Sequence, residues 1–253
     1  MKNFEGWRSE EGADARLTIS DQSEKGIARY AALCSDFTAD IDDLTAQLDP
    51  HERHVVHLAA AYATHRWDHL EGLAERAVAD GMTSVQIAEI CLQMTIYSGV
   101  AGFSDAMRKV ALGVERTGSV IEFDENPLSD VPQTAANMRD FLHGERQYLG
   151  HANPQNAFSA PLYNAATFHG YGLIWNRPGL ELRNRLVLAV AALAVVGPMN
   201  VLGKFALAAV SHGLSRESLR AIVIQTVLCQ GNSRAQHALV ELEELFSDLD
   251  KPD

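Results

Sequence analysis

The chain has 253 residues, of which 47% are hydrophobic and 7% aromatic, and its formal net charge is −12. This length and apolar fraction allow one large domain or two small ones, each with its own core. An acidic surface repels phosphate backbones, so we expect no nucleic-acid partner.

Two further features of the sequence indicate the cellular compartment. Cys34, Cys91 and Cys229 lie far apart and form no CxxC pair, which favours buried thiols in a reducing compartment over a disulfide framework. The first residues contain no apolar segment typical of a signal peptide, and the longest apolar run, 186–199, is too short to span a bilayer. We therefore expect a cytoplasmic protein with no membrane partner.

Apolar residues recur at three- and four-residue steps through most of the chain, which indicates helices. Residues 1–22 are polar and are predicted to form a loose arm. Gly81 and Gly99 are predicted to end helices and Thr83 to begin one. The expected helices cover 23–48, 53–64, 68–80, 84–97, 104–117, 135–148, 162–174, 180–196, 199–212, 215–229 and 234–246. Residues 118–132 and 150–161 are predicted to be linker and loop, so the predicted class is all-α.

An internal repeat organises the sequence. With an offset of 132, the segment 53–110 aligns without a gap to 185–242, with 13 identities in 58 pairs. Gly81, for example, aligns with Gly213 and Gln93 with Gln225. Because ungapped repeats indicate duplicated architectures, we expect two fused helical units related by a pseudo-twofold duplication. The predicted organisation is an arm over 1–22, a first unit over 23–118, a linker with a connecting helix over 119–161, and a second unit over 162–253.

Several motifs resemble a known family. The segment 171–180, YGLIWNRPGL, resembles the GE(V/I)WxRPGL signature of carboxymuconolactone decarboxylases, and 185–194, RLVLAVAALA, is similar to the helix that follows it. Segments 213–217 and 225–231 resemble the GLTxEE…LLQLAVYAG segment of the family, and 48–53, 81–83 and 93–99 are matching pieces in the first copy. The resemblance to this family and to the alkylhydroperoxidase D-like superfamily implies an all-α fold with pockets between helical units. It also implies a homo-oligomer, with a trimer favoured for a chain of two units.

The peroxidase branch of this superfamily carries a CxxC thiol pair. These two positions fall on Arg66 and His69 in the first copy and on Pro198 and Val201 in the second. Without the thiol pair no disulfide cycle is possible, so the sequence argues against a thiol peroxidase.

Other functional positions of the superfamily have also changed. The His position falls on Leu73 and Phe205, and a Glu position falls on His54 and Leu186. The Glu of the decarboxylase signature corresponds to Leu173. The fold signature is therefore kept while the catalytic signature is not, and fold alone does not define function.

Polar residues of the first copy form one candidate site: His54, His65, Arg66, Asp68 and His69. His65 and His69 would share a face if the helix is continuous between them. Asp68 would then orient an imidazole that acts as general acid or base, while Arg66 holds a substrate carboxylate. The alternative is a solvated helix start with exposed histidines. The HxxxH spacing permits a metal, but HExxH is missing and no Cys lies close, so we predict no metal and no other cofactor.

The second candidate region lies just before the second copy. There His169, Tyr171, Trp175 and Arg177 lie close together, and Trp175 would pack on a flat ring while Arg177 pairs with an acid. The alternative is that Trp175 belongs to the core and Arg177 only precedes a helix. Tyr97, from the YAG turn, would donate to a carbonyl or merely cap the core. Weaker candidates are Asn153, Tyr163 and Asn164.

These patterns favour an enzyme resembling carboxymuconolactone decarboxylase. We expect cofactor-free lyase, isomerase or cyclase chemistry on a small carboxylate- or lactone-bearing substrate, in natural-product or aromatic-compound metabolism. In such chemistry a proton moves at carbon while an enolate-like charge is stabilised. The apolar positions Pro198, Val201 and Phe205 indicate either an inactive copy or an apolar wall for a substrate. The alternative function is a non-catalytic paralogue that binds a small molecule or only assembles.

Overall fold

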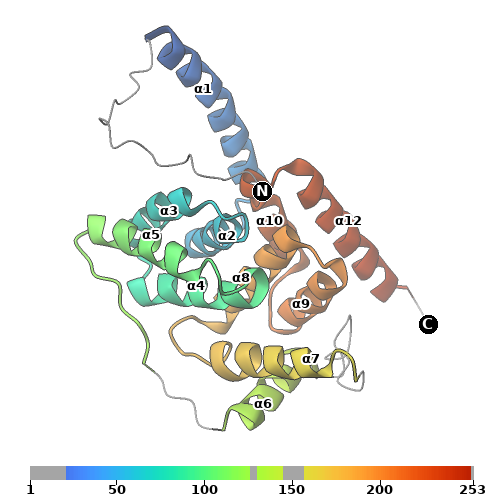
Figure 1. Cartoon of the computed structure of the whole chain (residues 1–253). Helices are drawn as coiled ribbons and strands as arrows, with labels where there is room; N and C mark the ends of the chain where they lie inside the picture. The colour runs from blue at the N-terminus through green and yellow to red at the C-terminus, as the bar shows by residue number, and fades with distance from the viewer. Residues whose placement is uncertain (1–20, 126–129, 145–156, 252–253) are drawn as a thin grey trace, which may run out of the picture. The chain divides into compact units, whose positions relative to one another are not determined.

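The computed structural model describes residues 21–125, 130–144 and 157–251, and its regular elements over these ranges are all helices (Figure 1). The predicted all-α class is confirmed. The arm predicted over 1–22 lies outside the described residues except for its last two, which begin α1 (Asp21–Leu44). The chain divides into two compact units, Met1–Asp40 and Ile41–Asp253, and the boundary falls near the end of α1.

The larger unit contains three groups of helices. The first group is α2 (Pro50–Ala63), α3 (Trp67–Ala79), α4 (Ser84–Ser98) and α5 (Phe103–Arg116). A connector follows, made of α6 (Val131–His143), α7 (Ala160–Thr167) and the π-helix η2 (Phe168–Ile174). The last group is α8 (Leu182–Val196), α9 (Met199–Ser211), α10 (Arg216–Gln225), α11 (Val227–Gln230) and α12 (Asn232–Leu249).

Local sequence signals explain most helix boundaries. Asp49 and Glu52 form a capping box at the start of α2, and Thr83 and Gln86 form another at the start of α4. Gly81 follows α3 with a φ of 99°, a left-handed conformation that suits glycine. The predicted ends of these helices therefore agree with the structure to within a few residues.

Three predicted helices need correction. The helix predicted over 162–174 changes to π-helical hydrogen bonding at Phe168, and the Trp175 amide donates to the Gly170 carbonyl five residues back. The helix predicted over 215–229 is interrupted at Thr226, whose hydroxyl bonds to the Val223 carbonyl and competes with the backbone ladder. The helix predicted over 135–148 begins earlier, at Val131, because the preceding aspartate caps it.

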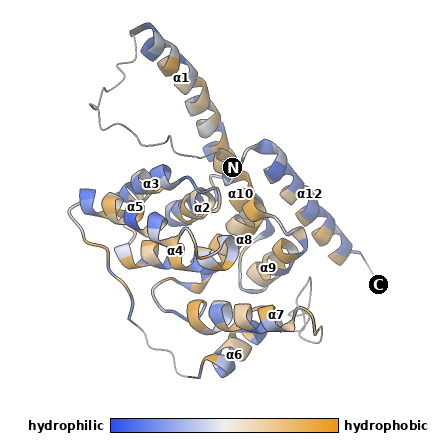
Figure 2. Ribbon diagram, in the orientation of Figure 1, coloured by the Kyte–Doolittle hydropathy of each residue, from blue (hydrophilic) through white to orange (hydrophobic). Residues whose placement is uncertain are grey.

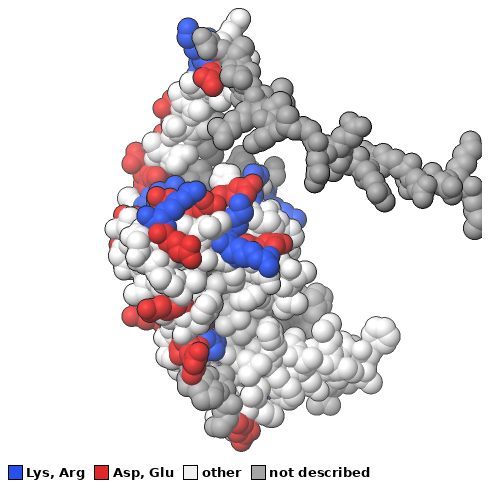
Figure 3. All heavy atoms as spheres, turned by 60° about the vertical axis from the view of Figure 1, so that its left-hand side comes forward, with Lys and Arg blue, Asp and Glu red and all other residues white. Residues whose placement is uncertain are grey.

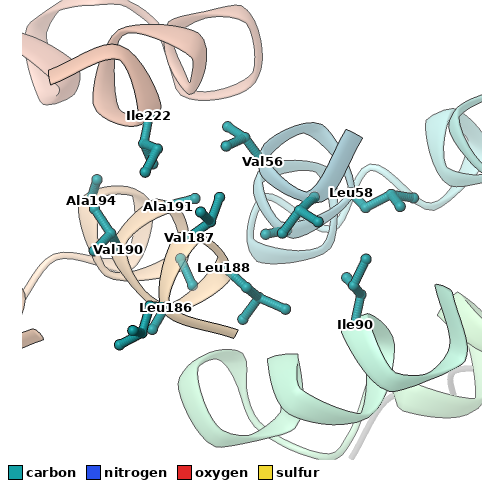
Figure 4. Close-up of a cluster of buried hydrophobic side chains, with 14 of the residues drawn as sticks. Val56, Leu58, Ile90, Leu186, Val187, Leu188, Val190, Ala191, Ala194 and Ile222 are labelled. Carbon is teal, nitrogen blue, oxygen red and sulfur yellow. The ribbon is translucent and has the colours of Figure 1, made fainter. Parts of the chain in front are cut away.

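The core of the larger unit forms where α2 and α8 pack together (Figure 4). Every residue of α8 from Arg185 to Val195 is buried, and Leu186, Leu188 and Val190 show no more than traces of exposure. Ile90 of α4 and Ile222 of α10 pack against the same pair. Because this core is closely packed, a large-to-small change such as Leu188→Ala would cost about 2–5 kcal/mol.

The outer helices are amphipathic. In Figure 2 hydrophilic and hydrophobic residues alternate along α12, whose buried positions are Ala235, Ala238, Leu242 and Phe246. This spacing of three and four residues places one face of α12 on the core. Among the described residues, no helix has both the length and the apolar character needed to cross a membrane.

The connector packs closely on both groups of helices. Its α6 contacts η2 and α9, and η2 contacts α4. The approach of α6 to η2 requires a glycine, because a Cβ atom at Gly172 would lie 2.7 Å from Val131 Cγ1 and 2.9 Å from the Val131 carbonyl oxygen. The connector is thereby held against the ends of α4 and α9, where the candidate site lies.

Candidate active site

The connector covers a cavity of about 440 Å³. Its walls come from α4, α6, α7, η2, α8 and α9 and are mostly aliphatic or aromatic, as is usual for small-molecule sites. The lining residues are Ile96, Tyr97, Arg139, Tyr163, Ala166, Thr167, Gly170, Tyr171, Trp175, Leu193, Val196, Pro198, Val201, Lys204 and Phe205.

Phe205 is the centre of the aromatic part of the wall. Its ring stacks on Trp175 with 5.8 Å between centroids and meets the edge of Tyr97 at 6.2 Å. His143 also stands edge-on to Phe205, at 4.9 Å. Such offset and edge-to-face contacts favour one arrangement of the rings, so this wall is rigid. The superfamily His position, which is Phe205 here, therefore contributes shape rather than acid–base chemistry.

Tyr97 supplies a hydroxyl that lies near the side chains of Gln93 and Trp175 but makes no hydrogen bond of good geometry within the described part of the chain. The oxygen is buried, and burial raises the pKa of the phenol, although nearby Gln93, Trp175 and Arg185 oppose this shift. The hydroxyl is therefore protonated at neutral pH. A buried donor without a partner costs free energy, and a ligand in the cavity would relieve that cost.

A second phenol in the wall is held by a hydrogen bond. The Tyr171 oxygen lies 2.9 Å from His143 Nε2, and the Asn176 amide donates to the Tyr171 carbonyl at 2.6 Å. Burial raises the pKa of Tyr171 as well. This pair orients the Tyr171 ring against Trp175, with 6.5 Å between centroids.

Two cationic side chains line the same cavity. Arg139 donates to the Tyr163 hydroxyl at 2.5 Å, and Lys204 as a whole residue is only 6% exposed. Burial, and to a lesser extent the Arg139 charge, lowers the pKa of Lys204 to about 8. Among the described lining residues there is no Asp or Glu. Arg139 and Lys204 are thus the charged side chains among the described lining residues.

Of the sequence-predicted site residues, Tyr97, Tyr171 and Trp175 line this cavity, as does the weaker candidate Tyr163. The apolar positions Pro198, Val201 and Phe205 line it as well, as the apolar-wall alternative expects. His65, Arg66, Asp68 and His69 line a separate, open hollow of about 680 Å³. All four are exposed, as the solvated-helix alternative expects.

The interactions of these four residues differ from those we expected. The helix is not continuous between His65 and His69, because α2 ends at Ala63 and His65 has a φ of 56°. Asp68 bonds to Lys109 at 2.7 Å instead of orienting an imidazole, and Lys109 lowers the pKa of that carboxyl. The face that carries α3 and α5 presents several such interleaved charges (Figure 3). The catalytic role of the four residues stays an untested prediction.

The remaining predicted residues pair within the protein. His54 Nε2 lies 2.7 Å from an Asp80 carboxylate oxygen, and His169 Nε2 lies 3.4 Å from the Thr95 hydroxyl. Arg177 pairs with an acid, as expected of it, but the acid is Glu89 of α4, at 2.7 Å. None of these three predicted residues lines the cavity.

The sequence reasoning missed Arg139, His143 and Lys204. One signal for Lys204 was available, since it is the only charged residue in the apolar stretch 199–210. Arg139 and His143 lie on the connector, for which the repeat offers no counterpart. Asn153, one of the weaker candidates, lies outside the described residues.

A second hollow, of about 440 Å³, lies at the repeat-related positions. Cys229 lines it where the repeat places the counterpart of Tyr97, and Arg66 lines it where the repeat places the counterpart of Pro198. Burial raises the pKa of the Cys229 thiol, while Arg66 partly opposes that shift. No described connector residue lines this hollow, so the two sites differ in structure.

Within the described ranges, no group of three His, Cys, Asp or Glu side chains lies close enough to hold a metal ion.

The described fold defines an all-α protein with an aromatic-walled cavity. Residues 29–111 match the model of the Carboxymuconolactone decarboxylase family. The 4-carboxymuconolactone decarboxylase of Acinetobacter baylyi (strain ATCC 33305 / BD413 / ADP1) is 26% identical over 112 residues, which are 44% of this chain and 84% of that protein.

Residues 29–111 of this chain are therefore similar to the Carboxymuconolactone decarboxylase family. The resemblance inferred from its motifs is confirmed, whereas the tandem arrangement stays a prediction. Of the residues that line the cavity, only Ile96 and Tyr97 lie inside the matched range. The connector and the second group of helices supply all the others.

Proposed function

We propose that the protein is a cofactor-free lyase, isomerase or cyclase that acts on a small carboxylate- or lactone-bearing molecule in the cavity beneath the connector. The observation that carries this proposal is that two cations, Arg139 and Lys204, line the same cavity as Tyr97, whose hydroxyl has no well-formed hydrogen bond to a described residue. The family match over residues 29–111 supports decarboxylase-like chemistry, and the relative's name supports a carboxylated lactone as the starting point.

Each group has a distinct task in this proposal. Arg139 binds a substrate carboxylate, because a guanidinium offers paired donors that match the two oxygens. The rings of Trp175 and Phe205 exclude water and pack on the substrate's apolar part, which strengthens electrostatic interactions in the site. Tyr97 donates a hydrogen bond to the oxygen on which enolate-like charge develops, and then a proton to the neighbouring carbon.

The positions of the helices agree with the internal repeat. Helix starts at Pro50, Trp67 and Ser84 are each followed 132 residues later by another helix start, at Leu182, Met199 and Arg216. This agreement supports two fused units, and the cavity takes its walls from both of them and from the connector. We further propose that the chain assembles as a trimer in the cytoplasm, which light scattering in solution would test.

Matched ligands test the binding part of the proposal. By isothermal titration, pentanoate should bind at least about tenfold more tightly than pentanamide, because a charge-assisted bond to Arg139 is worth about 1.5–3 kcal/mol. Arg139→Gln should abolish that preference. Arg108→Gln, an exposed arginine on α5, is the matched control and should leave it unchanged. Equal affinity for the acid and the amide would contradict the proposal.

Turnover separates an enzyme from a binding paralogue. The full chain is incubated in D₂O with a panel of small lactone and oxo carboxylates, and CO₂ release and deuterium incorporation at carbon are followed by NMR. At least one compound should react, and Tyr97→Phe should slow it. Tight binding of the whole panel without either reaction would favour the non-catalytic alternative.

A further inference from the structure

Lys204 is an unusual residue for its position. It lies on α9, a helix that is otherwise rich in Ala, Leu and Val, and its side chain is buried in the cavity wall next to Phe205. Lysines near a surface usually bury only their methylene stem and keep the ammonium in water. A buried lysine that faces a ligand cavity is therefore a candidate for chemistry.

The surroundings of Lys204 favour its neutral amine form. Burial removes water from the ammonium, and the guanidinium of Arg139 is close enough to repel it. With the pKa lowered to about 8, roughly a tenth of the amine is neutral at pH 7. Lys109 on α5 is the opposite case, because Asp68 stabilises its ammonium and raises its pKa. Burial next to a second cation is a known way to activate a lysine amine towards carbonyl groups.

We propose that Lys204 is the nucleophile of the site and forms an imine with a ketone carbonyl of the substrate, a small oxo acid whose carboxylate is held by Arg139. This inference rests on the proposed function and deepens it, since it assigns the substrate class. Arg139 and the apolar wall both favour the neutral form of the Lys204 amine. In this route the imine nitrogen, in place of the carbonyl oxygen, takes up the charge that develops during the reaction, so no cofactor is needed.

The chemical steps balance without an oxidant or reductant. The Lys204 nitrogen attacks the carbonyl carbon, proton transfers lead to loss of one water, and an iminium ion forms. The departing carboxylate is carried by the carbon next to the iminium carbon. The electron pair of the bond between that carbon and the carboxylate moves towards the iminium, which releases CO₂ and leaves an enamine. Tyr97 gives its proton to the enamine carbon, which regenerates the iminium. Water then hydrolyses the iminium to the ketone and the Lys204 ammonium, and this ammonium returns a proton to the Tyr97 phenolate. The carboxylate at Arg139 stays in the product, so the substrate class is a small oxodicarboxylate.

Reductive trapping tests the proposal. The full chain is incubated with 4-oxopentanoate and sodium cyanoborohydride, and labelled lysines are mapped by peptide mass spectrometry. At pH 7 Lys204 should be labelled at least about tenfold faster than Lys109, because far more of its amine is neutral. Excess pentanoate, which has the carboxylate but no ketone, should protect it. Labelling of Lys204 no faster than of Lys109 overturns the proposal.

Two variants separate this proposal from the proposed function. Lys204→Arg should lose the label while pentanoate binding persists, and Lys109→Arg should leave the labelling of Lys204 unchanged. Failure of wild-type protein to bind pentanoate would contradict the proposed function. Pentanoate binding without preferential labelling of Lys204 would contradict the imine alone.

Discussion

Arg185 and Gln93 exchange two hydrogen bonds across the core. The Arg185 guanidinium donates to Gln93 Oε1 at 2.9 Å, and the Gln93 amide donates to the Arg185 carbonyl at 3.0 Å. The same guanidinium binds Glu89 at 2.8 Å and the Arg177 carbonyl at 2.7 Å. This network joins α4, the residues after η2 and α8, so it fixes the two sides of the cavity relative to each other.

Arg185→Gln should therefore destabilise the protein strongly. The change leaves Glu89, which is 2% exposed, with one of its two arginines, and breaking a buried charge pair costs about 3–5 kcal/mol. Urea unfolding followed by circular dichroism would measure this loss. Arg216→Gln removes an exposed pair with Asp250 and should change the unfolding free energy far less. Similar losses in the two variants would contradict the structural role of the network.

Tyr97→Phe should separate stability from function. Because the hydroxyl is buried without a described partner, its removal should leave the unfolding free energy unchanged or raise it by up to about 1 kcal/mol. Turnover, however, should fall by roughly 10²- to 10⁴-fold if the phenol transfers a proton. Tyr171→Phe is the control, because it breaks the bond to His143 and should lower stability by about 1 kcal/mol. A Tyr97→Phe enzyme with full turnover would remove the phenol from the mechanism.

The sequence predicted the helices better than the site, for physical reasons. Helix boundaries depend on local signals such as the Thr83 cap and Gly81, which can be recognised in a few neighbouring residues. The cavity depends on the placement of Arg139 against Lys204, which are 65 positions apart and belong to different groups of helices. Tyr97 was found because it belongs to a family motif. The π-helix at η2 has no simple sequence pattern, and it is what turns Tyr171 and Trp175 towards the same wall.

Lys204 should give stability a distinct pH dependence. Its pKa is lower in the folded chain, about 8, than the ordinary 10.5, so between these values the unfolded chain binds more protons. Its contribution therefore destabilises the fold below pH 8 and disappears as the pH rises towards 10.5. Lys204→Met should raise the unfolding free energy at pH 7 by up to about 3 kcal/mol.

Urea unfolding at pH 7, 8, 9 and 10 would test this. The difference in unfolding free energy between Lys204→Met and wild type should narrow as the pH rises. Cys91, whose pKa burial raises from 9.0 to about 12, changes stability in the opposite direction but equally in both proteins, so its effect cancels in this difference. Lys109→Met serves as the control, because its ammonium is stabilised rather than destabilised by its neighbours. A gap that does not depend on pH would mean that Lys204 is an ordinary cation in the folded protein.

Gly172→Ala should disturb the cavity through its wall. The new Cβ would meet Val131 at 2.7 and 2.9 Å, so η2 must move away from α6. Overpacking of this kind costs about 1–3 kcal/mol, and the shift should weaken pentanoate binding because η2 carries Tyr171 and leads into Trp175. Gly26→Ala, a helical glycine with no atom within 4 Å of its added Cβ, should leave binding unchanged and favour the helix slightly. If Gly172→Ala lowered stability but left binding intact, the connector would be a structural cover and not part of the site.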